Sequence, residues 1–280
     1  MTAPDPPLSP KAYAFLADLV YDRSRIRLGP DRQAFVAGRL TSRLRELGCR
    51  SFEEYCSRLT LPRADDEAER VIDLVSTNHT HFFREPDHFN HLVRAVLPAA
   101  VGRAAAAGRP VRVWCAAAAS GEEAYSLAIV LAESERLHSG SRWELTASDI
   151  SRRMLDRCRA GIYEAERVQL PDPAWLPRYF RRGFGEREGQ YRIKPALRAR
   201  LSVKAINLFQ ASYPLPAEQD AIFCRNVMIY FDEASRQTLV ARMFDQLAGG
   251  GQLFVGHAES LLGLRHRFRQ VGPAVYERPA

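Results

Sequence analysis

Residues 111–151 decide the fold, because VRVWCAAAASGEEAYSLAIV (111–130) is followed, after a polar stretch, by WELTASDIS (143–151). Each quoted segment opens with a short strand-like run, and a helical pattern then begins at Gly121 in the first and at Ser151 in the second. Further strand-like runs follow at LSVKAIN (201–207), DAIFCRNVMIY (220–230) and QLFVGHAE (252–259). This alternation predicts an α/β fold, in which a mostly parallel sheet is covered by helices on both faces.

Two segments near the C-terminal half depart from this alternation. The run AVYERP (274–279) can add an edge strand to the sheet. Between Tyr179 and Lys204, RRGFGEREGQYRIKP (181–195) is rich in glycine and polar residues. That composition predicts a small β-hairpin inserted into the larger domain.

The first 76 residues carry helical patterns only. Ser9 and Pro10 predict an N-cap followed by a first-turn proline, and Asp31 can cap a second helix that Gly48 stops. Ser51 and Glu54 form a capping box for a third helix, and a last apolar pattern ends near residue 75. We therefore expect a small all-helical unit from residue 9 to about 76.

Composition places the chain among folded proteins without a membrane span. It has 280 residues, 46% hydrophobic, and a net charge of +7 that fits either a solvated surface or a docking surface for acidic partners. The N-terminus MTAPDPPLSPK lacks the features of a signal peptide, and no stretch approaches the roughly 18 apolar residues of a membrane helix. The cysteines are odd in number and contain no C-x-x-C, which argues against disulfides or a zinc cage and favours the cytoplasm. They are Cys49, Cys56, Cys115, Cys158 and Cys224.

The turn after the first strand is the first candidate binding site. Small residues lead to Gly121, which would let a ligand approach the backbone and the N–H groups of the next helix. The dinucleotide fingerprint G-x-G-x-x-G is absent, and Glu122 and Glu123 would repel a pyrophosphate. They can hold the ammonium and sulfonium groups of S-adenosylmethionine, or they can simply favour the N-terminus of the helix. Asp149, which ends the second strand, can accept ribose hydroxyls or cap the helix that begins at Ser151.

The segment 76–85, STNHTHFFRE, joins the helical unit to the sheet and is unusually dense in polar and aromatic residues. Asn78 and Thr80 can hydrogen-bond an amino-acid moiety, and Arg84 can orient a carboxylate through its planar guanidinium group. Four histidines suggest a metal, but no Cys, Asp or Glu cluster with ligand spacing accompanies them, so we expect no metal site. These histidines are His79, His81, His88 and His91.

Five runs resemble, in this order, the CheR family of chemotaxis receptor methyltransferases: TNHTHFFREPDHF, ASGEEAYSLAI, ASDIS, IFCRNVMIYFD and LFVGHAESL. The resemblance implies a Rossmann-like class I S-adenosylmethionine-dependent methyltransferase sheet, an N-terminal all-α domain and a small inserted antiparallel β-subdomain. The implied limits are a receptor-docking domain at 1–76, a linker with a leading helix at 77–110, and a methyltransferase domain at 111–280. The inserted β-subdomain is expected at 180–204.

The resemblance also implies site residues. Tyr230 matches the family tyrosine that lies near the methyl group. Our hypothesis for catalysis is that Arg84 grips one oxygen of the acceptor carboxylate and that the Tyr230 hydroxyl helps to fix the sulfonium group or the substrate. The alternative is that Arg84 only closes over the cofactor and Tyr230 packs in the strand-to-helix turn. The cofactor residues that the resemblance implies are Asn78, Thr80, Arg84, Glu123, Asp149, Asn207, Leu208, Arg225 and Asn226. The chain departs from the family pattern S-T-G-E-E-P-Y at Ala119 and Ala124, which puts cofactor affinity and activity in doubt.

The implied reaction is transfer of a methyl group from S-adenosylmethionine to glutamate side chains on chemoreceptor cytoplasmic helices, giving methyl esters and S-adenosylhomocysteine. An unperturbed glutamate has a pKa of about 4.3, so the acceptor is ionised and needs no general base. The implied partner is the receptor cytoplasmic domain. Residues 23–50 contain eight arginines, which can attract it. The C-terminal tail of the receptor can pair with the β-subdomain. We expect a cytoplasmic monomer that binds no nucleic acid. The alternatives are a noncatalytic S-adenosylmethionine-binding regulator and a nucleic-acid methyltransferase, against which the residues after the fourth strand argue.

Overall fold

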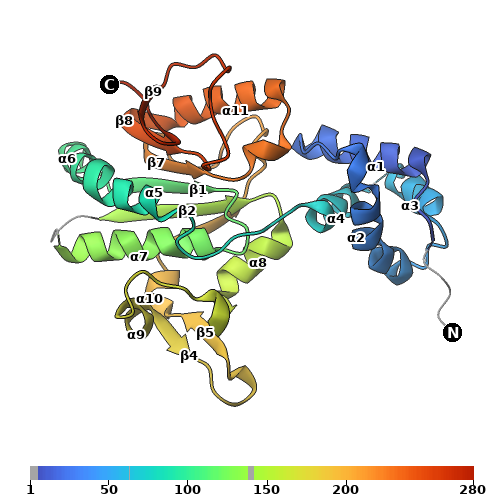
Figure 1. Ribbon diagram of the computed structural model, residues 1–280, viewed down its shortest axis with the longest axis horizontal. Coiled ribbons are helices and arrows are strands. Elements are labelled where there is room, and N and C mark those ends of the chain that lie inside the picture. The colour runs from blue at the N-terminus through green and yellow to red at the C-terminus, as the bar shows by residue number, and fades with distance from the viewer. Residues whose placement is uncertain (1–5, 63, 138–141) are drawn as a thin grey trace. The chain divides into compact units, whose positions relative to one another are not determined.

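The computed structural model describes residues 6–62, 64–137 and 142–280 (Figure 1). Residues 1–5, part of the stretch in which the sequence predicts no signal peptide, lie outside the described residues. The chain divides into two compact units. The first comprises residues up to Thr77 together with Tyr230–Asp232, and the second comprises Asn78–Ile229 and Glu233–Ala280.

The first unit is helical, as predicted. Its elements are α1 (Pro10–Ser24), the 3-10 turn η1 (Pro30–Arg32), α2 (Gln33–Glu46), α3 (Phe52–Leu59) and α4 (Asp65–Val75). The Ser9 hydroxyl accepts the Ala12 N–H at 3.2 Å, and the Ser51 hydroxyl accepts the Glu54 N–H at 3.2 Å, so both predicted N-caps are confirmed. The other half of the predicted capping box is wrong, because the Glu54 carboxylate accepts the Arg50 N–H in place of the Ser51 N–H. Apolar side chains on the inner faces of all four α-helices are buried and form the core, among them Leu16, Leu40, Tyr55 and Val71.

One predicted cap in this unit is wrong. Asp31 lies inside η1, and α2 begins at Gln33 without a side-chain hydrogen bond at its N-cap. Pro30 fixes its own φ and starts the 3-10 turn one residue before Asp31, which therefore sits too early to cap α2.

The second unit contains a seven-stranded sheet in the order β6-β2-β1-β7-β8-β10-β9. Neighbours among the first five strands pair in parallel, and β10 pairs antiparallel with both β8 and β9. The strands are β1 (Val111–Ala116), β2 (Trp143–Asp149), β6 (Leu201–Ala205), β7 (Gln219–Cys224), β8 (Leu247–Phe254), β9 (Arg269–Gly272) and β10 (Val275–Glu277). The predicted mostly parallel sheet is confirmed.

Helices cover this sheet. They are α5 (Pro86–His91), the π-helix η2 (Leu92–Val96), α6 (Leu97–Ala106), α7 (Glu122–Leu137), α8 (Arg152–Ala160) and α11 (Glu233–Gln246). Helix α6 packs on β1, α7 and α8 pack on β2, and α11 packs on β8. Every residue of β7 is buried, as expected for a central parallel strand covered on both faces. No helix in the described ranges is long and apolar enough to cross a membrane.

The position predicted for the last strand is wrong. AVYERP forms β10, which lies between β8 and β9 and not at the edge. The edge strand is β9, which was not predicted. A tight turn with Ala274 at φ 54° folds the chain back, so β10 pairs on one side with β9 and on the other with β8.

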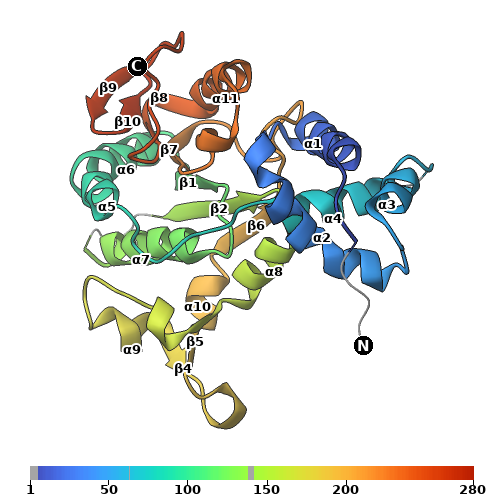
Figure 2. The same ribbon diagram turned by 45° about the vertical axis from the view of Figure 1, so that its right-hand side comes forward.

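A second, three-stranded antiparallel sheet has the order β3-β5-β4. Its strands β4 (Phe180–Arg182) and β5 (Gln190–Ile193) form the expected hairpin, and β3 (Ile162–Glu164) adds a strand from earlier in the chain. The turns η3 (Ala165–Arg167) and η4 (Gly185–Arg187) and the short helices α9 (Trp175–Tyr179) and α10 (Pro195–Arg198) accompany it. We call these elements together, residues 162–198, the inserted β-subdomain, and Figures 1 and 2 show this lobe beside α7. The range expected for the β-subdomain, 180–204, includes most of β6, but β6 pairs with β2 in the large sheet.

Candidate functional site

The parallel strands end at one edge of the large sheet, and the predicted residues follow those ends. Ala116 of β1 pairs with Ser148 of β2 and with Cys224 of β7, so these three strands end side by side. Asp149 pairs with Ala205, which brings in the end of β6. Ligands of open α/β sheets bind outside the carboxyl ends of the strands, so this edge is the candidate site.

The turn between β1 and α7 has an unusual backbone. Ala117 and Ala119 have φ values of 61° and 46°, and Gly121 has a φ of 97°. A Cβ at Gly121 would lie 2.5 Å from the Cys158 sulfur and 3.0 Å from the Tyr163 hydroxyl, so only glycine fits there. Alanine is strained at the two other positions, and its small side chain leaves the backbone accessible. The turn fits a ligand that contacts main-chain groups.

Asp149 joins this turn to the start of α8. Its Oδ2 accepts the Ala119 N–H at 2.8 Å, and its Oδ1 accepts the Ser151 N–H at 2.9 Å. The N-cap of α8 is the Ser151 hydroxyl, which accepts the Met154 N–H, and not Asp149. A carboxylate has about four acceptor positions, so these two bonds are compatible with the predicted contact between Asp149 and ribose hydroxyls.

Arg225 is the hub of the site. Its side chain is fully buried and donates to Glu123 at 2.6 Å, to Glu85 at 2.8 Å and to the Arg84 carbonyl at 2.6 Å. Burial raises the pKa of Glu123 while Arg225 opposes the rise. Burial acts to raise the pKa of Glu85, but the hydrogen bond and charge of Arg225, together with hydrogen bonds from His257 and Asn226, bring that pKa below its ordinary value. One guanidinium group thus ties the linker, the first turn of α7 and the end of β7 together.

A second carboxylate organises the loops after β7 and β8. Glu259 accepts the N–H groups of Asn226 and Met228, both at 2.7 Å, and of Gly256 at 2.6 Å. Asn226 has a φ of 57°. A Cβ at Gly256 would lie 2.3 Å from Nδ2 of Asn226. The loop carrying Asn226 is therefore held by its neighbour in a conformation that it would not adopt alone.

Backbone strain is concentrated at this edge. Of the eight non-glycine residues with positive φ in the described ranges, five belong to the linker or to the turns after β1 and β7. They are Phe83, Glu85, Ala117, Ala119 and Asn226. Such conformations persist only where the surroundings fix them, and they are typical of functional sites.

The remaining predicted residues have local roles in the structure. Thr80 accepts a hydrogen bond at its carbonyl from Arg167 (3.2 Å), and Arg84 donates to the His79 carbonyl at 3.3 Å. Asn207 and Leu208 follow β6; the Asn207 side chain accepts the Phe209 N–H at 2.9 Å, and the Leu208 carbonyl accepts the Tyr213 hydroxyl. Asn78 is half-buried at the start of the linker. All of these residues belong to the second unit.

Tyr230 belongs to the first unit, where its carbonyl accepts the Arg27 N–H at 2.9 Å. It ends the 3-10 turn η5 (Met228–Tyr230). Joint action of Tyr230 with Arg84 stays a prediction.

Sequence reasoning missed three residues of this edge. Glu85 and Glu259 lie inside quoted runs, directly after Arg84 and two residues after His257, and their presence in those runs was the available signal. Arg167, which bonds to both Thr80 and Glu122, lies in a polar stretch without any motif. Its role depends on a contact between segments distant in the chain, and sequence spacing does not report such contacts.

Glu85, His88 and His257 form a cluster whose ligand atoms lie within 4.8 Å of one another. Burial and the nearby Arg225 lower the pKa of His88 to about 4. The oxygen of Glu85 that lies nearest His88 also accepts from Arg225, whose fixed positive charge would repel a divalent cation. We therefore assign no metal to this cluster. The spacing in the sequence did not reveal that Glu85 and His257 lie beside His88.

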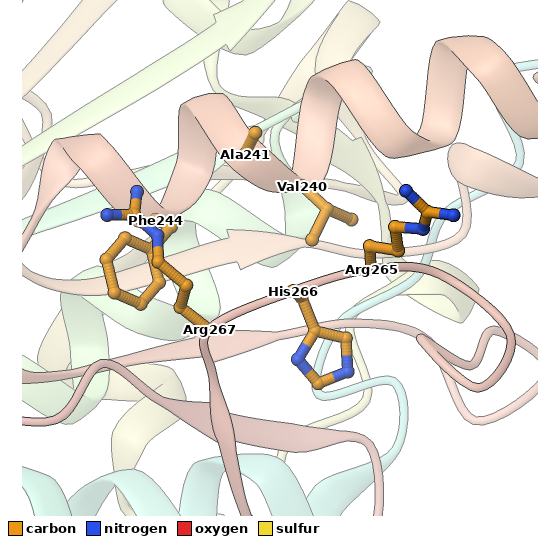
Figure 3. A pocket seen from close by; sticks show the side chains of 6 residues that line it. All are labelled: Val240, Ala241, Phe244, Arg265, His266 and Arg267. Atoms are coloured by element: carbon orange, nitrogen blue, oxygen red, sulfur yellow. The ribbon is translucent and has the colours of Figure 1, made fainter.

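A separate pocket of about 270 Å³ lies between α11 and residues 265–267 (Figure 3). The Arg267 guanidinium group lies 3.9 Å from the centre of the Phe244 ring and pairs with Asp245 at 2.7 Å. The lining residues are Val240, Ala241, Phe244, Arg265, His266 and Arg267, none of which is a predicted site residue.

Comparison with known proteins adds two family matches. Residues 78–276 match the family described as CheR methyltransferase, SAM binding domain, and residues 11–76 match CheR methyltransferase, all-alpha domain. A chemotaxis protein methyltransferase of Escherichia coli (strain K12) is 38% identical, over 96% of this chain and 91% of its own length. Chemotaxis protein methyltransferase 2 of Pseudomonas aeruginosa is 39% identical, over 92% of this chain and 89% of its own.

Proposed function

The chain belongs to the CheR methyltransferase family, and on this premise we propose that it methylates glutamate side chains of a chemoreceptor, using S-adenosylmethionine. The S-adenosylmethionine-binding family domain spans every predicted cofactor residue, from Asn78 to Asn226. The chain is therefore a methyltransferase with an S-adenosylmethionine cofactor, and its glutamate acceptor and receptor partner are the proposal.

The strained, carboxylate-rich edge around Arg225 is the observation that carries this function. Glu123 in the first turn of α7 and Asp149 at the end of β2 are almost fully buried, beside a turn of small residues. Their negative charge fits the sulfonium and ammonium groups of the cofactor, and Asp149 stands at the end of the second strand, where a carboxylate can accept ribose hydroxyls. The replacements at Ala119 and Ala124 are accommodated: Ala119 donates its N–H to Asp149, and Ala124 is buried in the first turn of α7.

The chemistry that the residues must support is positioning. Bound S-adenosylmethionine supplies an electrophilic methyl group. The acceptor carboxylate is ionised at neutral pH, so the chain has to place and desolvate it, which can contribute about 7 to 11 kcal/mol. In our proposal Arg84 holds one carboxylate oxygen and leaves the other free, and the Tyr230 hydroxyl fixes the cofactor or the acceptor. A single-turnover measurement in Arg84→Ala tests this role: a slower chemical step supports it, and weaker cofactor binding alone opposes it.

The first unit offers a docking surface for an acidic receptor helix. Exposed arginines on and beside α2 include Arg39, Arg45 and Arg50. Arg23 and Arg43 pair with Asp65 and Glu67 of α4, so the local charge is smaller than residues 23–50 alone suggest. We infer that these exposed arginines on and beside α2 attract the receptor by long-range electrostatics.

Strand β4 offers a place for the receptor's C-terminal tail. It is an edge strand of the small sheet, and Phe184, just beyond it, is 83% exposed. An extended segment can add to such an edge through main-chain hydrogen bonds. We place the reaction in the cytoplasm, where receptor cytoplasmic domains lie and where the five free cysteines would stay reduced, and we propose a monomer.

Incubation with labelled S-adenosylmethionine and candidate acceptors tests the proposed function. Label in the receptor as a base-labile ester supports it. Label in nucleic acid, or cofactor binding without any transfer, would replace it with one of the two alternatives, a nucleic-acid methyltransferase or a noncatalytic regulator.

A further inference from the structure

The first strand of the small sheet lies against the candidate cofactor site. The Tyr163 hydroxyl, on β3, donates to the Ser120 carbonyl at 2.8 Å, and its ring lies 5.0 Å from that of Phe82 in the linker. The same hydroxyl would lie 3.0 Å from a Cβ at Gly121. The inserted β-subdomain therefore packs on both segments that are proposed to hold the cofactor.

Arg167, at the end of η3, bonds to both of these segments through one nitrogen. Its Nη2 donates to the Thr80 carbonyl at 3.2 Å and to the Glu122 carboxylate. Thr80 is a predicted cofactor residue, and Glu122 begins α7 beside Glu123. The guanidinium group thus fixes the linker to the turn from which α7 starts.

The Glu122 carboxylate requires a positively charged partner at this link. Its side chain is fully buried, and its second oxygen accepts the Ser120 hydroxyl at 2.6 Å. A buried carboxylate needs a paired charge or hydrogen-bond donors. Loss of Arg167 would leave Glu122 without its paired guanidinium group, and the turn and linker would lose their common anchor.

We propose that Arg167 is a positioning residue for the cofactor, through which the inserted β-subdomain sets the affinity for S-adenosylmethionine. The inference rests on the proposed cofactor site, because Arg167 acts through Thr80 and Glu122. It extends that site, since none of the predicted cofactor residues comes from the β-subdomain.

A titration of the full-length protein with S-adenosylhomocysteine tests this role. Arg167→Met removes the charge and keeps the length of the side chain, and we expect the Kd to rise about tenfold. Arg178→Met is the matched control, because Arg178 belongs to the same lobe, is similarly exposed and pairs with Glu133 at 2.6 Å. Glu133 lies on α7 roughly 16 Å beyond Glu122 at 1.5 Å per residue. We expect the Kd of Arg178→Met to stay within about twofold of the native value.

Steady-state kinetics separate positioning from general destabilisation. Arg167→Met should raise the KM for S-adenosylmethionine by about the same factor as the Kd, with kcat at saturating cofactor within about twofold. Arg167→Lys, which keeps a cation, should recover part of the affinity and serves if the methionine variant does not fold. Adding Glu122→Gln to Arg167→Met should cause no further loss, since the two residues act as one unit.

An unchanged Kd in folded Arg167→Met, or an equal loss in Arg178→Met, contradicts the inference. Asp149→Asn in the same titration locates the fault. If Asp149→Asn weakens binding and Arg167→Met does not, only the role of Arg167 is wrong. If neither variant weakens binding, the proposed cofactor site is wrong, and the inference falls with it.

Discussion

Arginine is used in opposite ways in the two units. Arg225 in the second unit is fully buried and donates to two carboxylates and a carbonyl. Arg39 and Arg45 on α2 of the first unit are exposed, and Arg39 stacks on Phe35 with its charge facing solvent. A buried guanidinium group fixes geometry and is shielded from salt, whereas an exposed one acts at a distance and is screened by salt. The comparison suggests that the sheet edge positions the reaction and that α2 recruits the partner.

Removing Arg225 should have the largest effect. Arg225→Met leaves Glu85 and Glu123 buried without their paired charge, so the free energy of unfolding should fall by about 3 to 5 kcal/mol. Urea unfolding measures the loss, which should hardly change with salt. The control Arg267→Met removes an exposed pair with Asp245 and should cost less than about 1 kcal/mol. A small loss in Arg225→Met would contradict the role of Arg225 as the hub.

Acid should destabilise the interior through His88. Burial and Arg225 lower its pKa from 6.5 to about 4, with Glu85 opposing and His257 adding to the shift. Because the pKa of His88 is lower in the folded than in the unfolded protein, its contribution to the free energy of unfolding is fully present above pH 6.5. This contribution, about 3 kcal/mol, is lost as the pH falls toward 4. Unfolding at several pH values in the native protein and in His88→Phe measures this difference. Equal pH slopes in the two proteins would show that His88 is not held neutral.

Charge reversal on α2 should affect association more than stability. Arg39→Glu with Arg45→Glu should weaken receptor-fragment binding about tenfold at low salt, and the difference from native should shrink as salt is added. Arg94→Glu, also exposed but in the second unit, is the matched control and should leave binding nearly unchanged. Salt-independent binding of the native protein would exclude docking by α2.

Tail pairing at β4 should give the smallest effect. Deleting the C-terminal residues of the receptor should lower the methylation rate at limiting receptor concentration by about threefold, through loss of one attachment. Initial rates at several receptor concentrations measure it. No change in rate would leave β4 without a role in receptor binding.

Much of the fold and part of the site could be predicted because they depend on local patterns. The small-residue turn at Gly121 and the acid at Asp149 each follow a strand, and parallel strands bring such residues to one edge. The caps at Ser9 and Ser51 are short-range hydrogen bonds that sequence reveals directly.

Other features depend on contacts that sequence spacing does not report. Strand β3 has three residues, too few for a periodic pattern, and it pairs with β5 nearly thirty residues later. Resemblance suggested Arg225 as a cofactor residue, but its bonds to Glu85 and Glu123 join three distant segments. Glu259 acts by accepting backbone N–H groups, which leaves no motif.

Peptide mapping of a receptor cytoplasmic fragment by mass spectrometry, after incubation with this protein and S-adenosylmethionine, tests the central proposal most directly. We predict glutamate methyl esters, seen as a net mass gain of one CH2 because a methyl group replaces the acid proton. The gain should disappear on mild alkaline treatment and should be absent when Arg225→Met replaces the native chain. A methyl group that resists alkali, or one on a residue other than glutamate, would contradict the account.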